Sequence, residues 1–439
     1  MLIGLGKCAP VAAIIVGLLI SVLFTGGVRS TTAETLYESL SALVGSHKRL
    51  KAAKSDLDSA KNNASVAFGA WYPTLDITGH YGYEIQRKDE GVANTNMPTR
   101  EIDFKITQLL WDFGSTGGTI DQSDLAVLQA EVIFEATKQA LMLEAISAHL
   151  GLISAHEILG FAKGSEANIK RQTELEDARV KRGSGFSTDV LQAKAQLAGA
   201  QARRVQAEGA MHQARYRYMA VFGSVPDDIT QMKKPKVSVD LLPESLEAAV
   251  EMAVKSNLQI QATRIASNIA RSQTHKADAD GFYPTFNLIG ENKYKQDVGG
   301  TIGFKGEQII RVEATYNFNL GGTSFDTLEA TKQAFLASES RLGDAEDLVS
   351  EQARNAWQQL ETSRMNAQFL RNQANIASEF LDLARKERRL GRRSLIDVLA
   401  GETALINSSS DAAAAENNIA ISAFTLLNVL AQLNIEVVK

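Results

Sequence analysis

Few residues in this sequence have the types and spacing that chemistry on a substrate requires. His149 and His156 are two of the six histidines, and they lie seven positions apart in a helical stretch. A helical metal pair needs a separation of about four positions, so we interpret both as packing or surface residues. The sequence contains no glycine-rich phosphate loop, zinc motif or nucleophile elbow. We therefore expect neither an enzyme nor a bound metal or other cofactor.

Cysteine chemistry is excluded because the only cysteine lies in a segment that is predicted to be removed. Cys8 is the only cysteine, and it precedes an apolar run at 11–24. Residues 1–33 are predicted to be an export signal, because Lys7 supplies positive charge before the apolar run and small residues lead to a cleavage site near Ala33. The alternative, an uncleaved anchor, is disfavoured because a membrane span needs about 20 apolar residues. The mature chain would then contain no cysteine and no disulfide.

Two short stretches share one pattern of glycine and charge. Gly183 precedes Asp189 by six positions, and Gly391 precedes Asp397 by the same interval. The glycines are 208 positions apart (391 − 183), and so are the aspartates (397 − 189). Each stretch lies between long alanine-rich helical segments, which predicts a tight reversal between two helices. We therefore expect two halves built to one design.

Long helices are expected to make up most of the chain. The 439 residues include only 7 prolines and 7% aromatic residues, against 44% hydrophobic residues. Apolar side chains recur at threes, fours and sevens across 115–181 and 324–390, a spacing typical of coiled-coil packing. A continuous helix of this length would extend about 100 Å. The net charge of −5 is spread along the chain and disfavours a nucleic-acid partner.

Four runs have a period of two instead. They form two pairs, within 73–113 and 284–320, in which apolar and polar residues alternate. Alternation predicts strands with one apolar and one polar face. We expect the glycine pairs at 117–118 and 321–322 to be strand-to-helix hinges. Aromatic residues gather near the strand ends at Trp71, Tyr72, Trp111, Phe282 and Tyr283.

Two structures compete for these strands. They could form a small soluble sheet with one face on a core, or part of a membrane β-barrel with lipid outside and a water-filled lumen inside. The export signal and the aromatic residues, which suit interfacial girdles, favour the barrel. Single-chain barrels use at least about 8 strands, and unpaired edges in lipid cost several kcal/mol for each backbone group. Several chains would therefore have to share one barrel.

The predicted organisation has four segments, divided by the export signal and by a proline-containing linker. Each half is expected to hold a helix, a β-hairpin and a long helix pair. The segments are the signal at 1–33, a first repeat at 34–225 with its tip near 183–189, a linker at 226–243, and a second repeat at 244–439 with its tip near 391–397.

In this combination the sequence resembles the TolC family of outer-membrane ducts. The resemblance covers essentially the whole mature chain and includes a Gly-x-Arg-x-x-x-Asp-Val-Leu turn formed by Gly391, Arg393, Asp397, Val398 and Leu399. It implies a mainly α fold with a transmembrane β part, in which a homotrimer with four strands per chain forms a 12-stranded barrel. The barrel would continue into a periplasmic α-helical tunnel. The implied partners are outer-membrane lipid, a periplasmic adaptor and an inner-membrane ABC or proton-driven transporter, for drug efflux or type I protein secretion.

The resemblance also implies roles for residues at the tips of the helix pairs. Arg393 matches an arginine that links to the positions of Asp189 and Thr188 and helps to close the tunnel mouth. Asp397 matches the first aspartate of an acidic constriction ring. Adaptor contacts are implied for Gly183, Ser184, Gly391 and Arg392. A partly hydrated link of this kind would contribute about 1 kcal/mol or less. In the competing interpretation Arg393 and Asp189 are ordinary solvated charges at the tips.

The sequence departs from the family pattern near the second turn. Ala400 stands at the second acidic position of the better-known members, Arg388 stands at the position of a latch tyrosine, and Arg392 adds a positive charge. Glu402 need not face the lumen. Strong cation selectivity and the complete latch are therefore not implied.

Two functions of different classes follow. The first is a passive conduit in the outer membrane with its helices in the periplasm. The alternative is a structural coiled-coil or adhesive protein of the periplasm, which would be extracted without detergent.

Overall fold

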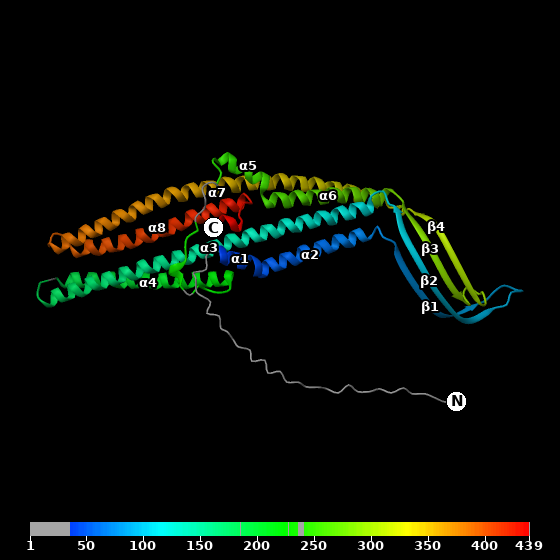
Figure 1. The fold of residues 1–439 in the computed structure, drawn as a ribbon, viewed down its shortest axis with the longest axis horizontal. Coiled ribbons are helices and arrows are strands. Elements are labelled where there is room, and N and C mark those ends of the chain that lie inside the picture. The colour runs from blue at the N-terminus through cyan, green and yellow to red at the C-terminus, as the bar shows by residue number, and fades with distance from the viewer. Residues whose placement is uncertain (1–35, 185, 227, 236–240, 439) are drawn as a thin grey trace, which may run out of the picture.

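The computed structural model describes residues 36–438 except 185, 227 and 236–240 (Figure 1). The export signal predicted at 1–33 lies outside these residues. The helices run side by side in one long body, with a sheet at one end and two helix-pair tips at the other (Figure 1). The sheet and the tips are thus separated by the full length of the molecule.

The first half places two helices before two strands and two helices after them. Its elements are α1 (Leu36–Ser46), α2 (Lys48–Gly69), β1 (Thr74–Gln86), β2 (Thr95–Trp111), α3 (Ser115–Lys181) and α4 (Ser187–Phe222). The one helix expected before the first hairpin is in fact two helices, because the chain is extended at His47. The side chain of His47 accepts a hydrogen bond from the Arg49 N–H and so caps α2. A break of one residue leaves the apolar spacing nearly unchanged, which explains the error.

The second half has the same order of elements after a short 3-10 helix, η1 (Ile229–Gln231), in the linker. Ser245 caps the first helix of this half by accepting a hydrogen bond from the Ala248 N–H. The elements are α5 (Leu246–Ser256), α6 (Leu258–Phe282), β3 (Thr285–Gln296), β4 (Phe304–Thr315), α7 (Thr323–Arg389), α8 (Leu395–Val429) and the 3-10 helix η3 (Ile435–Val438).

The longest helices, α3 and α7, have 67 residues each and therefore extend about 100 Å. They pack against α4 and α8 toward the tips and against α2 and α6 toward the sheet. The main apolar core lies midway, where α1 and the ends of α4 and α8 meet α3. Leu40, Met142, Ile146 and Phe424 are fully buried there. This core joins α1, α3, α4 and α8 into one unit.

Both helix pairs reverse at a glycine with positive φ. Gly183 has a φ of +75° and Gly391 a φ of +73°, and a side chain at either position would be strained. The predicted reversals therefore have a backbone reason for glycine. Each following helix begins within four residues of its glycine, at Ser187 and Leu395.

The four strands form one antiparallel sheet in the order β1-β2-β3-β4. The second hairpin ends before residue 320, the end expected from alternation, because β4 begins at Phe304 and ends at Thr315. Residues 316–320 alternate in sequence but continue outside the strand. An alternating segment forms a strand only where a neighbouring strand is present, and alternation in the sequence does not show where that neighbour ends.

The prediction of hinges at the two glycine pairs is wrong for the first pair and half right for the second. Gly117 and Gly118 lie inside α3, and the turn before that helix is made by Gly114, with a φ of +100°. Gly118 instead permits close helix contact, since an added Cβ would lie 3.1 Å from the Cβ of Lys276 in α6. In the second half Gly322 makes the turn, with a φ of +70°.

Candidate transport path and helix-tip site

One face of the sheet presents large apolar side chains to the surroundings. Tyr81 is 76% exposed and Ile310 is 84% exposed. A soluble protein seldom leaves a continuous apolar surface of this kind uncovered. The face suits hydrocarbon better than water. Its exposed members include Leu75, Ile77, Tyr83, Ile85, Ile102, Ile106 and Val312.

The opposite face carries ion pairs that cross between strands. Lys295 Nζ on β3 lies 3.4 Å from Glu101 on β2 and 3.1 Å from Glu307 on β4. Arg311 on β4 lies 2.9 Å from Glu291 on β3. Charged groups in such numbers require water or close partners. The sheet thus has the two faces that a barrel wall needs.

The sheet is open at both edges within one chain. Among the described residues β1 pairs only with β2, and β4 pairs only with β3. Since neighbouring strands alternate in direction, β4 of one copy can pair antiparallel with β1 of the next. An open edge in lipid would leave backbone groups unpaired. The strand arrangement therefore suits closure by further copies.

Four of the five predicted interface aromatics are exposed where the sheet meets the helices: Trp71, Tyr72, Trp111 and Tyr283. Phe113 connects two of them: it stacks on Tyr283 at 4.7 Å and meets Trp111 edge-on at 6.0 Å between ring centroids. Phe282 instead packs against Phe325 of α7, at 5.0 Å between centroids. Trp111, Phe113 and Tyr283 therefore form one aromatic cluster at the junction.

At the tips, Arg393 does not pair with Asp189 within one chain. Its Nε lies 2.6 Å from an oxygen of Glu387, and its guanidinium lies 5.2 Å from the ring centroid of Phe380. Both partners belong to α7, so Arg393 is held on its own helix pair. Asp189 lies in the first turn of α4, and no ion pair of the described chain includes it. Thr188 beside it is exposed.

A different ion pair connects the two helix pairs near their tips. Arg388 on α7 donates from Nη2 to Oε1 of Glu176 on α3 at 2.9 Å, and Arg179 donates to the same oxygen at 2.8 Å. The Glu176 side chain is only 4% exposed. Sequence reasoning identified Arg388 only as a departure from the family and missed Glu176. The sequence of α3 contains several glutamates, and no local pattern distinguishes Glu176 as the buried one.

Glu402 forms a second connection between the helix pairs. Its side chain is 2% exposed, forms an ion pair with Arg385 of α7, and accepts a hydrogen bond from Asn168 of α3 at 3.5 Å. The structure therefore buries Glu402 between helices. Asp397 is partly exposed in the first turn of α8, where its N–H donates to Ser394 Oγ at 3.3 Å.

The predicted adaptor-contact residues are exposed at the two tips. Gly183, Ser184, Gly391 and Arg392 all belong to the turns or adjoin them. Ser184 Oγ donates to the carbonyl of Arg179 at 3.2 Å and so ties down the end of α3. The four residues are therefore accessible from the end of the molecule opposite the sheet.

The two histidines do not form a metal site. His149 is buried, its Nε2 lies 2.9 Å from the Lys233 carbonyl oxygen, and burial lowers its pKa. His156 lies elsewhere on the partly exposed surface of α3. Within the described ranges no group of three or more His, Cys, Asp and Glu side chains could hold a metal ion.

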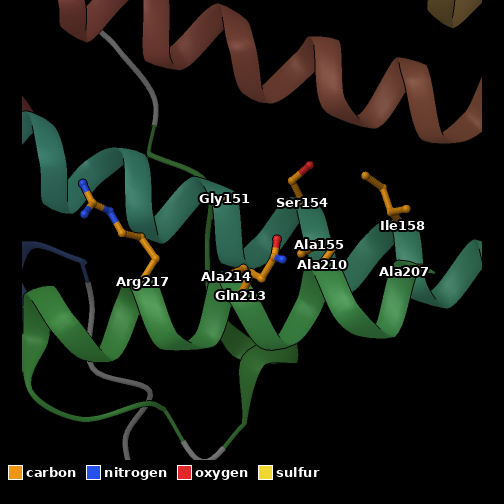
Figure 2. A pocket seen from close by; sticks show the side chains of 9 residues that line it. All are labelled: Gly151, Ser154, Ala155, Ile158, Ala207, Ala210, Gln213, Ala214 and Arg217. Atoms are coloured by element: carbon orange, nitrogen blue, oxygen red, sulfur yellow. The ribbon is translucent and has the colours of Figure 1, made fainter. Parts of the chain in front are cut away.

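A groove of about 420 Å³ lies between α3 and α4 (Figure 2). Small residues line it, including Gly151 and Ala155 on α3 and Ala210 and Ala214 on α4. Arg217 lies at one end and pairs with Glu144 at 2.8 Å. The groove follows from close helix packing by small residues, and it contains no cluster of groups suited to catalysis.

The fold and the sheet are those of a membrane channel protein with a long helical extension. The family model described as "Outer membrane efflux protein" matches residues 40–224. Outer membrane efflux protein BepC of Brucella suis is 25% identical over 412 residues, covering 93% of this chain and 88% of BepC. Outer membrane protein TolC of Escherichia coli is 22% identical over 429 residues, covering 95% of this chain and 86% of TolC.

The fold agrees with a solved channel as well. The outer membrane protein VceC of Vibrio cholerae superposes with a TM-score of 0.77 at 15% identity, covering 90% of this chain and 96% of VceC. The family model, the two relatives and the solved structure together indicate a TolC-family outer-membrane channel. The resemblance inferred from sequence is confirmed.

Proposed function

We propose that this protein is the outer-membrane exit duct of a tripartite export system and that three copies form one duct. The protein lies in the outer membrane with its helices in the periplasm. Each copy would contribute its four strands to a 12-stranded barrel. The duct is passive, and the energy for transport comes from the inner-membrane partner.

The observation that carries this proposal is the sheet, which has an exposed apolar face, a charged opposite face and two open edges. In a closed ring the apolar face meets lipid, the charged face meets water, and every edge finds a partner. An adhesive or structural periplasmic protein would have no need for such a sheet. The division into two repeats, each with a hairpin and a long helix pair, explains why both hairpins lie in one sheet.

The tips are the proposed contact and gating sites. Exposed Gly183, Ser184, Gly391 and Arg392 would meet a periplasmic adaptor. Arg393 pairs with Glu387 and not with Asp189 within the described chain, so the closing link to Asp189 and Thr188 is proposed to form between neighbouring copies. Three Asp397 carboxylates around one axis would attract cations. Arg392 from each copy would weaken that attraction.

The duct would serve small-molecule efflux or type I protein secretion, according to whether the partner is a proton-driven or an ABC transporter. The relative BepC is named as an efflux protein. Deleting the gene and measuring both drug sensitivity and secretion of large proteins distinguishes the two. Loss of resistance with normal secretion supports efflux, and the opposite result supports secretion.

The duct itself is tested on purified material. We expect the protein in the outer-membrane fraction, extracted only by detergent, with the mass of three chains in native mass spectrometry and with ion channels in planar bilayers. A single chain that remains soluble in buffer without detergent would contradict the proposal.

A further inference from the structure

The sheet is uneven at the end that lies away from the helices. Pairing between β2 and β3 stops at Arg100 and Gln296. Pairing between β1 and β2 continues for five more residue pairs, to Gln86 and Thr95. The hairpin of β1 and β2 therefore projects beyond the hairpin of β3 and β4, as Figure 1 also shows.

The loop that joins β3 to β4, residues 297–303, is attached to this projecting hairpin. Glu84 on β1 accepts hydrogen bonds from the backbone N–H groups of Gly299 at 3.1 Å and Gly300 at 2.8 Å. Lys88 Nζ donates to the Gly300 carbonyl at 3.0 Å. Hydrogen bonds to charged groups are the stronger ones in proteins. The loop is thus held at the backbone N–H groups of Gly299 and Gly300 and at the carbonyl of Gly300.

The path of the loop follows from the strand order. Strand β2 lies between β1 and β3, so a loop leaving β3 must cross β2 before it reaches Glu84. Glu84 alternates with Tyr83 and Ile85, which belong to the apolar face, and therefore points to the polar face. The loop consequently crosses β2 on the polar side of the sheet.

The loop is also ordered internally and packed closely against β1. Asp297 accepts a hydrogen bond from the Gly303 N–H at 2.7 Å, and its own N–H donates to the Gly303 carbonyl at 3.1 Å. Gly300 has a φ of +70°, and a Cβ placed on it would meet the side-chain oxygen of Gln86 on β1, so glycine suits this position for both reasons. The hydrogen bonds between Asp297 and Gly303 join the two ends of the loop, so the segment between them acts as a unit.

We propose that residues 297–303 form a strap across the lumenal side of the barrel at its outer end, which narrows the exit and sets the largest substrate that leaves. The inference rests on the proposed function, in which the polar face lines the lumen. With the helices in the periplasm, the strap lies at the external end. Each copy in the ring would contribute one strap, so the exit would be narrower than the barrel below it.

The test measures access from outside to a thiol placed below the strap. Thr78 lies on the polar face of β1, closer to the helices than Glu84, and Thr78→Cys in a Cys8→Ala background supplies the only thiol. Intact cells are treated with a small charged maleimide or with a maleimide on a long polyethylene glycol chain. We expect the small reagent to label Thr78→Cys and the long reagent to be excluded.

Removing the attachment should admit the long reagent. In Glu84→Ala/Lys88→Ala we expect its labelling rate to rise about tenfold, because three hydrogen bonds to charged groups are lost. The matched control is Arg87→Ala/Asp89→Ala, which removes one positive and one negative charge from exposed positions of the same hairpin. This control should exclude the long reagent as the parent does.

Failure of the strap proposal and failure of the proposed duct give different results in this experiment. Equal access of the long reagent in the parent and in Glu84→Ala/Lys88→Ala, whether high or low, overturns the strap and leaves the duct intact. Failure of the small reagent to label Thr78→Cys in folded, membrane-inserted protein instead overturns the assignment of the polar face to the lumen.

Discussion

Arg388 of α7 donates a hydrogen bond to Glu176 of α3 at 2.9 Å, and this ion pair joins the two helix pairs close to their tips. The carboxylate is almost fully buried and is shared with Arg179. A buried ion pair adds little net stability over an apolar contact, but the loss of one partner is costly because the other charge remains buried. The pair therefore favours one arrangement of the tips over others.

The first prediction concerns this pair. Arg388→Gln should destabilise this packing of the two tips by about 2 kcal/mol, less than loss of a full buried pair because Arg179 still contacts Glu176. We expect higher single-channel conductance in planar bilayers and a lower melting temperature. Arg389→Gln, at the exposed neighbouring position, is the control. The double variant Glu176→Gln/Arg388→Gln should recover part of the lost stability. Conductance and melting temperature like the parent's in Arg388→Gln would show that the pair does not hold the tips.

The second prediction concerns Glu402, which is buried against Arg385 and Asn168. Glu402→Gln preserves the size of the side chain but removes its charge, and should lower the free energy of unfolding by about 2 kcal/mol. Thermal unfolding of the purified protein measures the change. Glu379→Gln on the exposed surface of α7 should have little effect. If Glu402 instead lined the lumen, its variant would change ion selectivity and leave stability unaltered.

The pH dependence of stability should depend partly on His149. Burial holds the pKa of His149 below its usual 6.5, so the folded protein binds this proton less readily than the unfolded chain. Stability is therefore complete above 6.5 and falls as the pH drops below that value toward the folded pKa, by at most about 1.4 kcal/mol per pH unit. In His149→Gln, the melting temperature should change less with pH between about pH 7 and pH 5 than it does in the parent. His212→Gln, at an exposed position, should retain the slope. An unchanged slope in His149→Gln would assign the dependence to other groups.

Sequence patterns predicted the elements better than their contacts. The helix over 115–181 was predicted to the residue because a period change marks its start and a glycine turn follows its end. The hinge at Gly114 was missed because a neighbouring glycine pair offered an equally plausible turn. The partners of Arg393 and Arg388 could not be predicted, since long helices place many charges at equivalent spacings. Which of those charges is buried depends on how two helix pairs pack, and that information is not local.

The orientation of the sheet can be tested at two adjacent isoleucines. Ile310 lies on the exposed apolar face of β4, and Ile309 lies beside it on the face that carries Arg311. If the apolar face meets lipid, Ile310→Lys should cost about 2–4 kcal/mol and sharply reduce the trimer recovered from outer membranes. Ile309→Lys makes the same substitution one residue away and should be tolerated, because it adds a charge to a water-filled lumen. Quantitative immunoblots of unheated and heated membrane fractions measure the trimer in each variant. Equal recovery of the two variants would mean that neither face is buried in hydrocarbon, and a greater loss for Ile309→Lys would reverse the assignment of the two faces.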